Sequence, residues 1–333
     1  MTPTAQPERR DRPAAGPEVE RGEFAPPAPA AAGEGRLVVV TYNIRYAVGS
    51  HLIGGSLLRR VGLGWPGRRP RLVGSNIRRA ARVLSEGSRM PPADVVALQE
   101  ADRGTVRAGG RHVARELAGE LGMNYVRAHT PTPADAEPKD RRWWLDFEER
   151  MLLGEEGDTG VALLSRLPLS GARRIELPWE VCPWRPRLAV SARVPFGGRR
   201  LHVFNSHIDT HAAVEGQLAQ HRAVLALADG VEDGDAVVLL GDFNTLDEGA
   251  RRAARGLLEA RGYQTPMPTN TPTWRSGFIR HHFDWVFVRG ARVTRWGVAR
   301  VRGVSDHWPV WVELERVGGG GTALRGAGVG GEL

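Results

Sequence analysis

The sequence predicts an α/β or α+β sandwich, and its apolar segments are the main reason. Short runs of β-branched and other apolar residues recur along the chain, and several are apolar at every position, as in strands covered on both faces. The runs are Leu37–Tyr42, Val95–Leu98, Val161–Leu164, Leu188–Val194, Leu201–Phe204, Ala236–Leu240, Trp285–Val288 and Trp308–Val312. Amphipathic helical patterns lie between some of them, at Leu72–Leu84, Val113–Leu121, Val214–Leu227 and Glu248–Ala260. Many strands with a few helices indicate sheets and helices packed in layers.

The composition predicts one folded domain between two disordered tails. Residues 1–35 are rich in Pro, Ala, Gly, Glu and Arg and poor in large apolar types, so they bury too little surface to offset their ordering entropy. The glycine-rich stretch Val317–Leu333 is expected to be mobile for the same reason. No linker or repeat interrupts residues 36–316, and hydrophobic types at 41% of the chain are ample for a core.

Charge and membrane signals set wider bounds. A formal net charge of +8 favours an anionic partner, although arginine bias from a GC-rich genome explains it equally well, because Lys139 is the only lysine. The sequence has neither an 18-residue apolar stretch nor the apolar core of a signal peptide. We therefore expect a cytoplasmic monomer without a membrane span.

Polar side chains with chemical capability stand at the ends of six predicted strands. Four apolar runs lead into amides, carboxylates or a histidine, and two more are preceded by an aspartate or an Asp-His pair. Ligand sites in layered α/β proteins commonly form where such strand ends meet, so we expect one site there. Its candidate residues are Asn43, Glu100, His207, Asp209, Asp242, Asn244, Asp284, Asp306 and His307.

The chemistry of this set indicates a hard cation and a phosphate. Carboxylates and amides without cysteine ligands favour Mg²⁺ or Mn²⁺, whereas zinc prefers more His and Cys. A metal neutralises charge that develops on phosphate, amides donate to its oxygens, and a His–Asp pair moves a proton or supplies positive charge.

Each motif also has a simpler explanation. Asn43 after a strand and the Gly-Asp-x-Asn of residues 241–244 are both ordinary turn chemistry, and Asp209 could cap a helix that begins near Ala212. Their joint occurrence in order, each at a strand end, favours one site over six unrelated turns.

Seven segments together resemble the endonuclease/exonuclease/phosphatase superfamily, which includes deoxyribonuclease I, exonuclease III and neutral sphingomyelinases. The segments are Thr41–Ile44, Leu98–Glu100, Gly160–Arg166, Asn205–Asp209, Gly241–Asn244, Phe283–Trp285 and Ser305–Pro309. The resemblance implies a four-layer αββα sandwich, with two β-sheets face to face and helices outside. It also implies Mg²⁺-dependent hydrolysis of phosphate esters, with Mn²⁺ as the alternative ion.

The resemblance further implies roles for the metal and water ligands. Glu100 resembles the principal metal ligand, with Asn43 beside it. Asp242 and Asn244 look like the pair that orients the attacking water and the phosphate. Asp306 would lie near the metal or the phosphate.

The remaining roles concern proton transfer. His307 looks like the catalytic histidine, with Asp284 as its carboxylate partner. His207 matches a second histidine that protonates the leaving oxygen or binds phosphate. Which histidine is the acid and which the base stays open, as does the role of Asp209.

The substrate class stays open as well. Arg45 stands where the exonuclease III branch carries an acidic or amide residue, so the chain looks closer to sphingomyelinase-like and general phosphodiesterase branches. Nucleic acid and phospholipid or small phosphodiesters are the alternatives. A non-catalytic anion-binding protein is the rival of another class, and the intact motif residues oppose it.

Two long segments, Tyr46–Arg71 and Thr130–Gly157, depart from the scaffold, and loops of this length are usually functional or disordered. Arginine can grip phosphate and tryptophan can stack on a base or enter a lipid interface, so these segments are expected to select the substrate. The candidate substrate-binding residues are Arg68, Arg69, Arg141, Arg142, Trp143 and Trp144.

Overall fold

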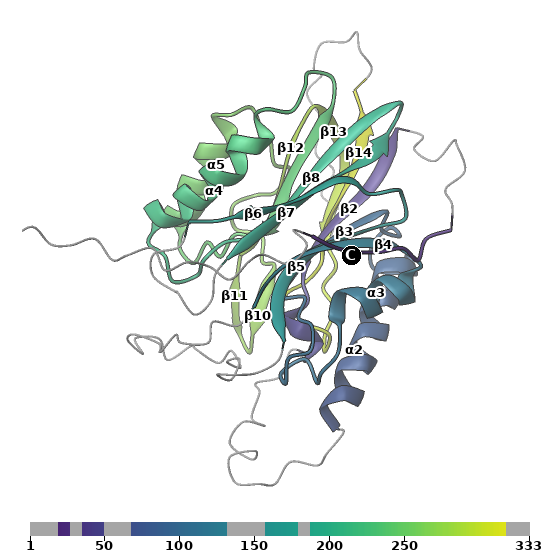
Figure 1. Ribbon diagram of the computed structural model, residues 1–333. Coiled ribbons are helices and arrows are strands. Elements are labelled where there is room, and N and C mark those ends of the chain that lie inside the picture. The colour runs from purple at the N-terminus through teal and green to yellow at the C-terminus, as the bar shows by residue number, and fades with distance from the viewer. Residues whose placement is uncertain (1–18, 27–34, 50–67, 132–156, 179–186, 318–333) are drawn as a thin grey trace, which may run out of the picture.

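The computed structural model describes residues 19–26, 35–49, 68–131, 157–178 and 187–317. Within them, two β-sheets pack face to face and helices cover their outer faces (Figure 1). The larger sheet has the order β1 (Glu20–Gly22), β4 (Asn124–Pro131), β5 (Asp158–Ser165), β3 (Val95–Gln99), β2 (Arg36–Asn43), β14 (Val310–Arg316) and β13 (Ala291–Val298). The smaller has the order β12 (Asp284–Arg289), β9 (Ala236–Asp242), β8 (Arg199–His207), β7 (Leu188–Phe196) and β6 (Ser170–Glu176).

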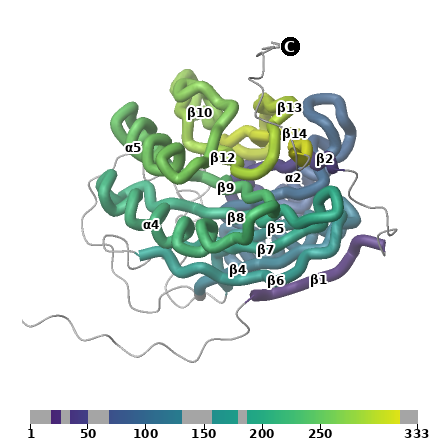
Figure 2. The backbone as a smooth tube through the Cα atoms, turned by 90° about the horizontal axis from the view of Figure 1, so that it is seen from above, coloured from purple at the N-terminus to yellow at the C-terminus, as the bar shows by residue number. Residues whose placement is uncertain are grey.

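Helices complete the four layers that the family resemblance implies. The larger sheet is covered by α2 (Arg68–Ser85) and α3 (Val113–Leu121), and the smaller by α4 (Val214–Ala228) and α5 (Glu248–Glu259), as Figure 2 shows from above. A short hairpin of β10 (Trp274–Ser276) and β11 (Ile279–His281) belongs to neither large sheet. Among the described residues, no helix has both the length and the apolar composition needed to cross a membrane.

Strands with both faces covered explain the continuous apolar runs. In β2, Val39 points into the core between the sheets, whereas Val38 and Val40 point toward α2 and α3. Successive strand side chains alternate between faces, so a strand that is buried on both must be apolar throughout.

One sequence expectation is wrong in part. Residues 1–35 were expected to be a disordered tail, but β1 pairs antiparallel with β4, with Arg21 opposite Val126. Polar contacts hold this short strand: Glu20 accepts a hydrogen bond from the Tyr125 hydroxyl at 2.7 Å and lies 2.6 Å from Nε2 of His112. The sequence prediction considered only the apolar surface that a segment can bury, and β1 is held by polar contacts instead. Of the two expected tails, residues 1–18, 27–34 and 318–333 lie outside the described residues.

Candidate active site

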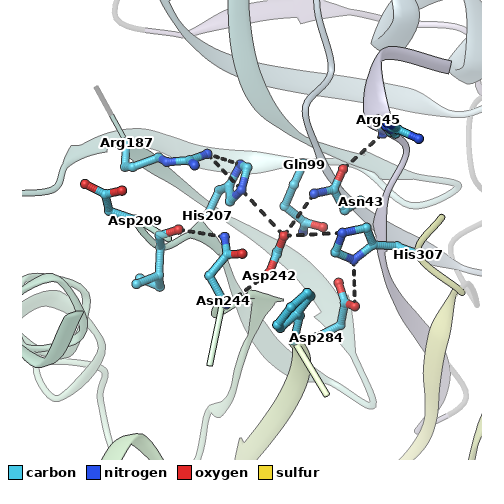
Figure 3. A network of polar contacts seen from close by, with 12 residues as sticks. Asn43, Arg45, Gln99, Arg187, His207, Asp209, Asp242, Asn244, Asp284 and His307 are labelled. Atoms are coloured by element: carbon cyan, nitrogen blue, oxygen red, sulfur yellow. Dashed lines mark hydrogen bonds and ion pairs between the residues drawn. The ribbon is translucent and has the colours of Figure 1, made fainter. Parts of the chain in front are cut away.

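Strand register brings the predicted residues to one edge of the two sheets. Strands β2 and β3 run parallel with Asn43 opposite Gln99, so Asn43 and Glu100 meet at one end of the larger sheet. In the smaller sheet Asp242 lies opposite His207 on one side and Asp284 on the other. Figure 3 shows the polar network that results where these ends face each other.

The backbone is strained at this edge. Five non-glycine residues in the described part of the chain have positive φ, and each lies in or directly beside a site motif. They are Arg45 (48°), Tyr46 (44°), Ala47 (59°), Glu100 (54°) and Asn244 (50°). Side chains with a Cβ adopt this region at a cost, and such residues concentrate at functional sites.

Asp242 is the centre of the network. Its Oδ2 accepts a hydrogen bond from Asn43 Nδ2 at 2.9 Å and lies 3.5 Å from Nε2 of His207 and 3.8 Å from Nε2 of His307. Its Oδ1 accepts from the backbone N–H of Asn244 at 3.0 Å. Burial raises the pKa of Asp242 to about 6, even though the His307 charge acts in the opposite direction. The carboxylate is therefore ionised at neutral pH and protonated in mild acid.

His307 and Asp284 form a buried pair. Nδ1 of His307 lies 2.9 Å from Oδ2 of Asp284. The Thr273 hydroxyl fixes this carboxylate's strand by accepting from the backbone N–H groups of Phe283 and Asp284, both at 3.0 Å. Burial lowers the pKa of His307, but the Asp284 and Asp242 carboxylates outweigh it and raise the pKa to about 10. The imidazole is therefore cationic at neutral pH.

Asp306 turns toward Arg45. Its Oδ2 lies 3.4 Å from Arg45 Nη1, and both side chains are largely buried. Ser305 joins this corner to the rest, because its hydroxyl donates to the backbone carbonyl of Asn43 at 2.8 Å and accepts from the His307 N–H at 3.2 Å. Burial lowers the pKa of Arg45, but Asp306 raises it above the usual arginine value, so the guanidinium stays charged.

Glu100 lies at the wall of a small cavity of about 20 Å³. The cavity is also lined by Thr130, Thr159, Arg187 and His207. The Glu100 carbonyl accepts from the N–H of Tyr46 at 3.1 Å, which ties the end of β3 to the turn after β2. The predicted metal ligand thus borders a cavity whose other polar walls include two hydroxyls and a guanidinium.

Comparison with known proteins identifies the family of the chain. The model of the endonuclease/exonuclease/phosphatase family matches residues 40–307. The chain belongs to this family. Its members are typically metal-dependent hydrolases of phosphoesters. No curated protein matches the sequence.

Solved structures show the same fold. An endonuclease/exonuclease/phosphatase protein from Beutenbergia cavernae is 22% identical, with a TM-score of 0.57 over 85% of this chain and 72% of that one. A family protein from Leptotrichia buccalis is 16% identical, with a TM-score of 0.54 over 84% and 99%. D. rerio TDP2 complexed with a single-strand DNA product is 16% identical, with a TM-score of 0.51 over 84% and 99%.

Arg187 is a site residue of this family member that the sequence motifs do not predict. Its side chain is buried, and its Nη1 lies 2.9 Å from Nδ1 and 2.8 Å from Nε2 of His207. An atom equidistant from both ring nitrogens lies over the ring face rather than in line with a lone pair. The Nε of Arg187 is buried without a hydrogen-bond partner among the described residues. Its only sequence signal is an arginine directly before the run Leu188–Val194, which is indistinguishable from a surface charge.

The structure also places the less certain candidates. Asp209 does not cap α4, whose N-cap is Ala213 without a side-chain hydrogen bond; instead its Oδ1 accepts from the His211 N–H at 2.9 Å. Arg68 and Arg69 form the first turn of α2, and the hydrogen bonds and ion pairs of Asp242 among the described residues involve neither of them. The other predicted substrate-binding residues, Arg141, Arg142, Trp143 and Trp144, lie outside the described residues.

Proposed function

We propose that this family member is a Mg²⁺-dependent phosphodiesterase that cleaves the P–O bond of a phosphodiester with an activated water. One observation carries the proposal: Asn43, His207 and His307 converge on one oxygen of Asp242, while Asp284 holds His307 from behind. Phosphoryl transfer needs a base, proton donors and groups that stabilise negative charge, and the carboxylate, two imidazoles and amide gathered here can supply them.

The metal position follows from the donor chemistry. Glu100, Asn43 and Asp306 offer hard oxygen atoms of the kind Mg²⁺ prefers, and Mn²⁺ is the alternative. Asp242, Asp284 and His307 also place ligand atoms within 4.8 Å of one another. Metal ligands must be deprotonated, however, and His307 carries a proton that Asp284 and Asp242 stabilise. We therefore assign the ion to the Glu100 side and the proton to the His307 side. The bound ion would neutralise charge on the phosphate.

The protein side chains have separate roles in proton transfer and charge stabilisation. Asp242 accepts a proton from the attacking water, and a pKa of about 6 leaves it ionised and basic enough for this at neutral pH. The His307 cation and the Arg187 guanidinium stabilise the negative charge of the transition state from two directions (Figure 3). As the new P–O bond forms, the bond to the leaving oxygen breaks, and we assign the proton that this oxygen gains to His207.

We further propose which class of phosphodiester is the substrate. D. rerio TDP2, complexed with a single-strand DNA product, has the same fold as this chain and so supports a nucleic acid. A phospholipid or small phosphodiester is the second candidate within the same chemistry. A protein that binds anions without hydrolysing them is the alternative of another class.

Hydrolysis of bis(p-nitrophenyl) phosphate tests the function directly, because it needs the chemistry without any larger substrate. We expect release of p-nitrophenol with Mg²⁺, none in excess EDTA, and a near-complete loss in His307→Ala. Leu227→Ala, on the exposed face of α4, is the matched control and should behave as wild type. Undiminished activity in EDTA, or binding of phosphate without hydrolysis, would contradict the proposal.

A further inference from the structure

The hairpin β10–β11 presents an unusual apolar tip. Ser276 pairs with Ile279, which leaves a two-residue turn of Gly277 and Phe278. Gly277 has φ +59° at the first turn position, where a tight hairpin of this type requires glycine. Phe278 is fully exposed at 102% relative accessibility, and Ile279 beside it is 48% exposed. In the described part of the chain they are the only adjacent pair of exposed large hydrophobic residues.

The hairpin is fixed to the candidate active site. The Arg275 N–H donates to the carbonyl of Asp306 at 2.9 Å, and the Trp308 N–H donates to the carbonyl of Thr273 at 2.7 Å. Trp274 lies opposite His307 in an isolated bridge. The Trp274 ring also packs 5.4 Å from Phe283, whose ring lies 6.0 Å from that of His307. The tip therefore has a set position relative to the reacting groups.

Two arginines flank the tip, and no carboxylate of the described residues pairs with either. Arg275 and Arg280 are direct cross-strand partners, an arrangement of like charges that destabilises a hairpin. The Arg275 guanidinium donates to the nearby carbonyl of Gly277 at 2.8 Å. From Arg261 to Ser305 the sequence contains a single acidic residue, the buried Asp284. A bound anion would offset this repulsion.

We propose that the β10–β11 hairpin binds the single-stranded nucleic acid that flanks the cleaved bond, with Phe278 stacking on a base and the Arg275–Arg280 pair holding a phosphate. The identity of the cleaved bond rests on the proposed function. Phe278 is four residues from Trp274, so the tip extends at most about 13 Å beyond it. A stacked strand rises about 3.4 Å per nucleotide, which places the tip a few nucleotides from the reacting phosphate.

The size of the tip favours a base over a membrane. Stable binding to a lipid interface takes a broad apolar face, whereas this tip offers two side chains between two arginines. Stacking needs one aromatic ring and an unstacked base, so a single strand or a frayed end is the matching partner. The charge on either side of the ring fits the alternation of base and phosphate along a strand.

Fluorescence anisotropy with labelled dT12 and rU12 tests the inference on the full chain, in EDTA to prevent cleavage. We expect Phe278→Ala to bind either oligomer about fivefold or more weakly than wild type. Arg280→Gln should lower the slope of log K against log salt by about 0.7, the value for one lost phosphate contact on a single strand. Leu227→Ala and Arg173→Gln are matched controls on exposed surface elsewhere and should bind as wild type. Phe278→Ala and the two controls should melt at the wild-type temperature, and Arg280→Gln, which removes the like-charge repulsion, should melt no lower.

Two outcomes overturn the inference: no binding of either oligomer by wild type, or wild-type binding of the oligomers by Phe278→Ala. If Phe278→Ala in the second case also loses binding to phosphatidylcholine–phosphatidylglycerol vesicles, the tip is a membrane anchor. Binding in EDTA does not depend on turnover. If wild type binds dT12 through Phe278 but does not hydrolyse bis(p-nitrophenyl) phosphate, the proposed function alone fails.

Discussion

Nε2 of Gln99 lies 2.6 Å from Oδ1 of Asn205, and this hydrogen bond joins the two β-sheets one residue from Glu100 and two from His207. Asn205 makes further bonds across the interface, because its Nδ2 donates to the carbonyls of Leu98 at 2.8 Å and Ala162 at 2.9 Å. Both amide side chains are fully buried. These buried hydrogen bonds therefore join the two sheets beside the candidate site, within an interface between the sheets that is formed mostly by apolar side chains.

Removing these hydrogen bonds should lower the free energy of unfolding substantially. Asn205→Ala removes three buried hydrogen bonds, one from the Gln99 amide and two to backbone carbonyls, and leaves Gln99 with its bond to the Thr41 hydroxyl at 3.1 Å. We therefore expect a loss of about 2–4 kcal/mol. Urea unfolding of the variant measures it. Asn270→Ala, at an exposed turn, is the matched control and should change stability by less than about 0.5 kcal/mol. An unaltered midpoint for Asn205→Ala would show that the bond contributes nothing.

Glu100 should determine metal affinity. Glu100→Gln keeps the shape of the side chain and removes its charge, so calorimetric titration with Mg²⁺ or Mn²⁺ should show affinity reduced by at least about tenfold with the fold retained. Asp233→Asn, an exposed carboxylate outside every site motif, should titrate as wild type. Equal affinity of Glu100→Gln and wild type would remove Glu100 from the metal site.

Much of this edge could be predicted from the sequence because its residues follow apolar runs. Asn43, Glu100 and Asp242 each come at the end of a strand that is apolar on both faces, and the parallel pairs β2–β3 and β8–β9 bring such ends to one edge. The helices could be predicted from a different pattern, because α2 and α3 each carry a clear apolar stripe at helical spacing.

Other features depend on pairings that a linear pattern does not contain. Gln99 and Asn205 are polar residues within buried strands, and only the register of the two sheets shows that they meet. In the sequence Arg187 looks like a surface charge, and only the fold shows that its guanidinium contacts the ring of His207. Strand β1 and the hairpin β10–β11 have three-residue strands, too short for any periodicity to be visible.

His307 and Asp284 should contribute unequally to turnover. His307→Ala removes the cation and should lower kcat for bis(p-nitrophenyl) phosphate by about 10²–10⁴-fold. Asp284→Asn keeps the imidazole and should cost less, although its buried amide holds the ring poorly. Steady-state rates with Mg²⁺ compare the two variants. If Asp284→Asn is the slower of the two, the carboxylate acts on more than His307.

The leaving group should reveal the proton donor. p-Nitrophenolate departs without a proton, whereas a nucleoside or alkyl alcohol needs one, so loss of the general acid matters only for the poorer leaving group. We expect His207→Ala to slow an alkyl phosphodiester far more than bis(p-nitrophenyl) phosphate. His307→Ala should slow both alike, because it removes charge stabilisation. The reverse pattern would exchange the roles of the two histidines.

Glu20 fastens β1 to the larger sheet through contacts that depend on pH. Burial alone would raise the pKa of Glu20, but the hydrogen bonds from His112 and Tyr125 lower it from 4.5 to about 2. A carboxyl whose pKa is depressed by folding stabilises the protein above its unfolded pKa, and this contribution is lost as the pH falls through the folded value. The Glu20 contribution is therefore complete above about pH 4.5 and fades toward pH 2.

Glu20→Gln should consequently destabilise the protein by about 1–2 kcal/mol at pH 7, since the amide cannot accept the same charge-assisted bonds. The difference between wild type and variant should be unchanged at pH 5 and should shrink as the pH falls below about 4.5. Guanidinium unfolding across this range measures it. Glu23→Gln, an exposed neighbour on the same segment, is the control and should match wild type at every pH. If Glu20→Gln is as stable as wild type at pH 7, β1 is held by its backbone pairing alone and the Glu20 contacts do not stabilise it.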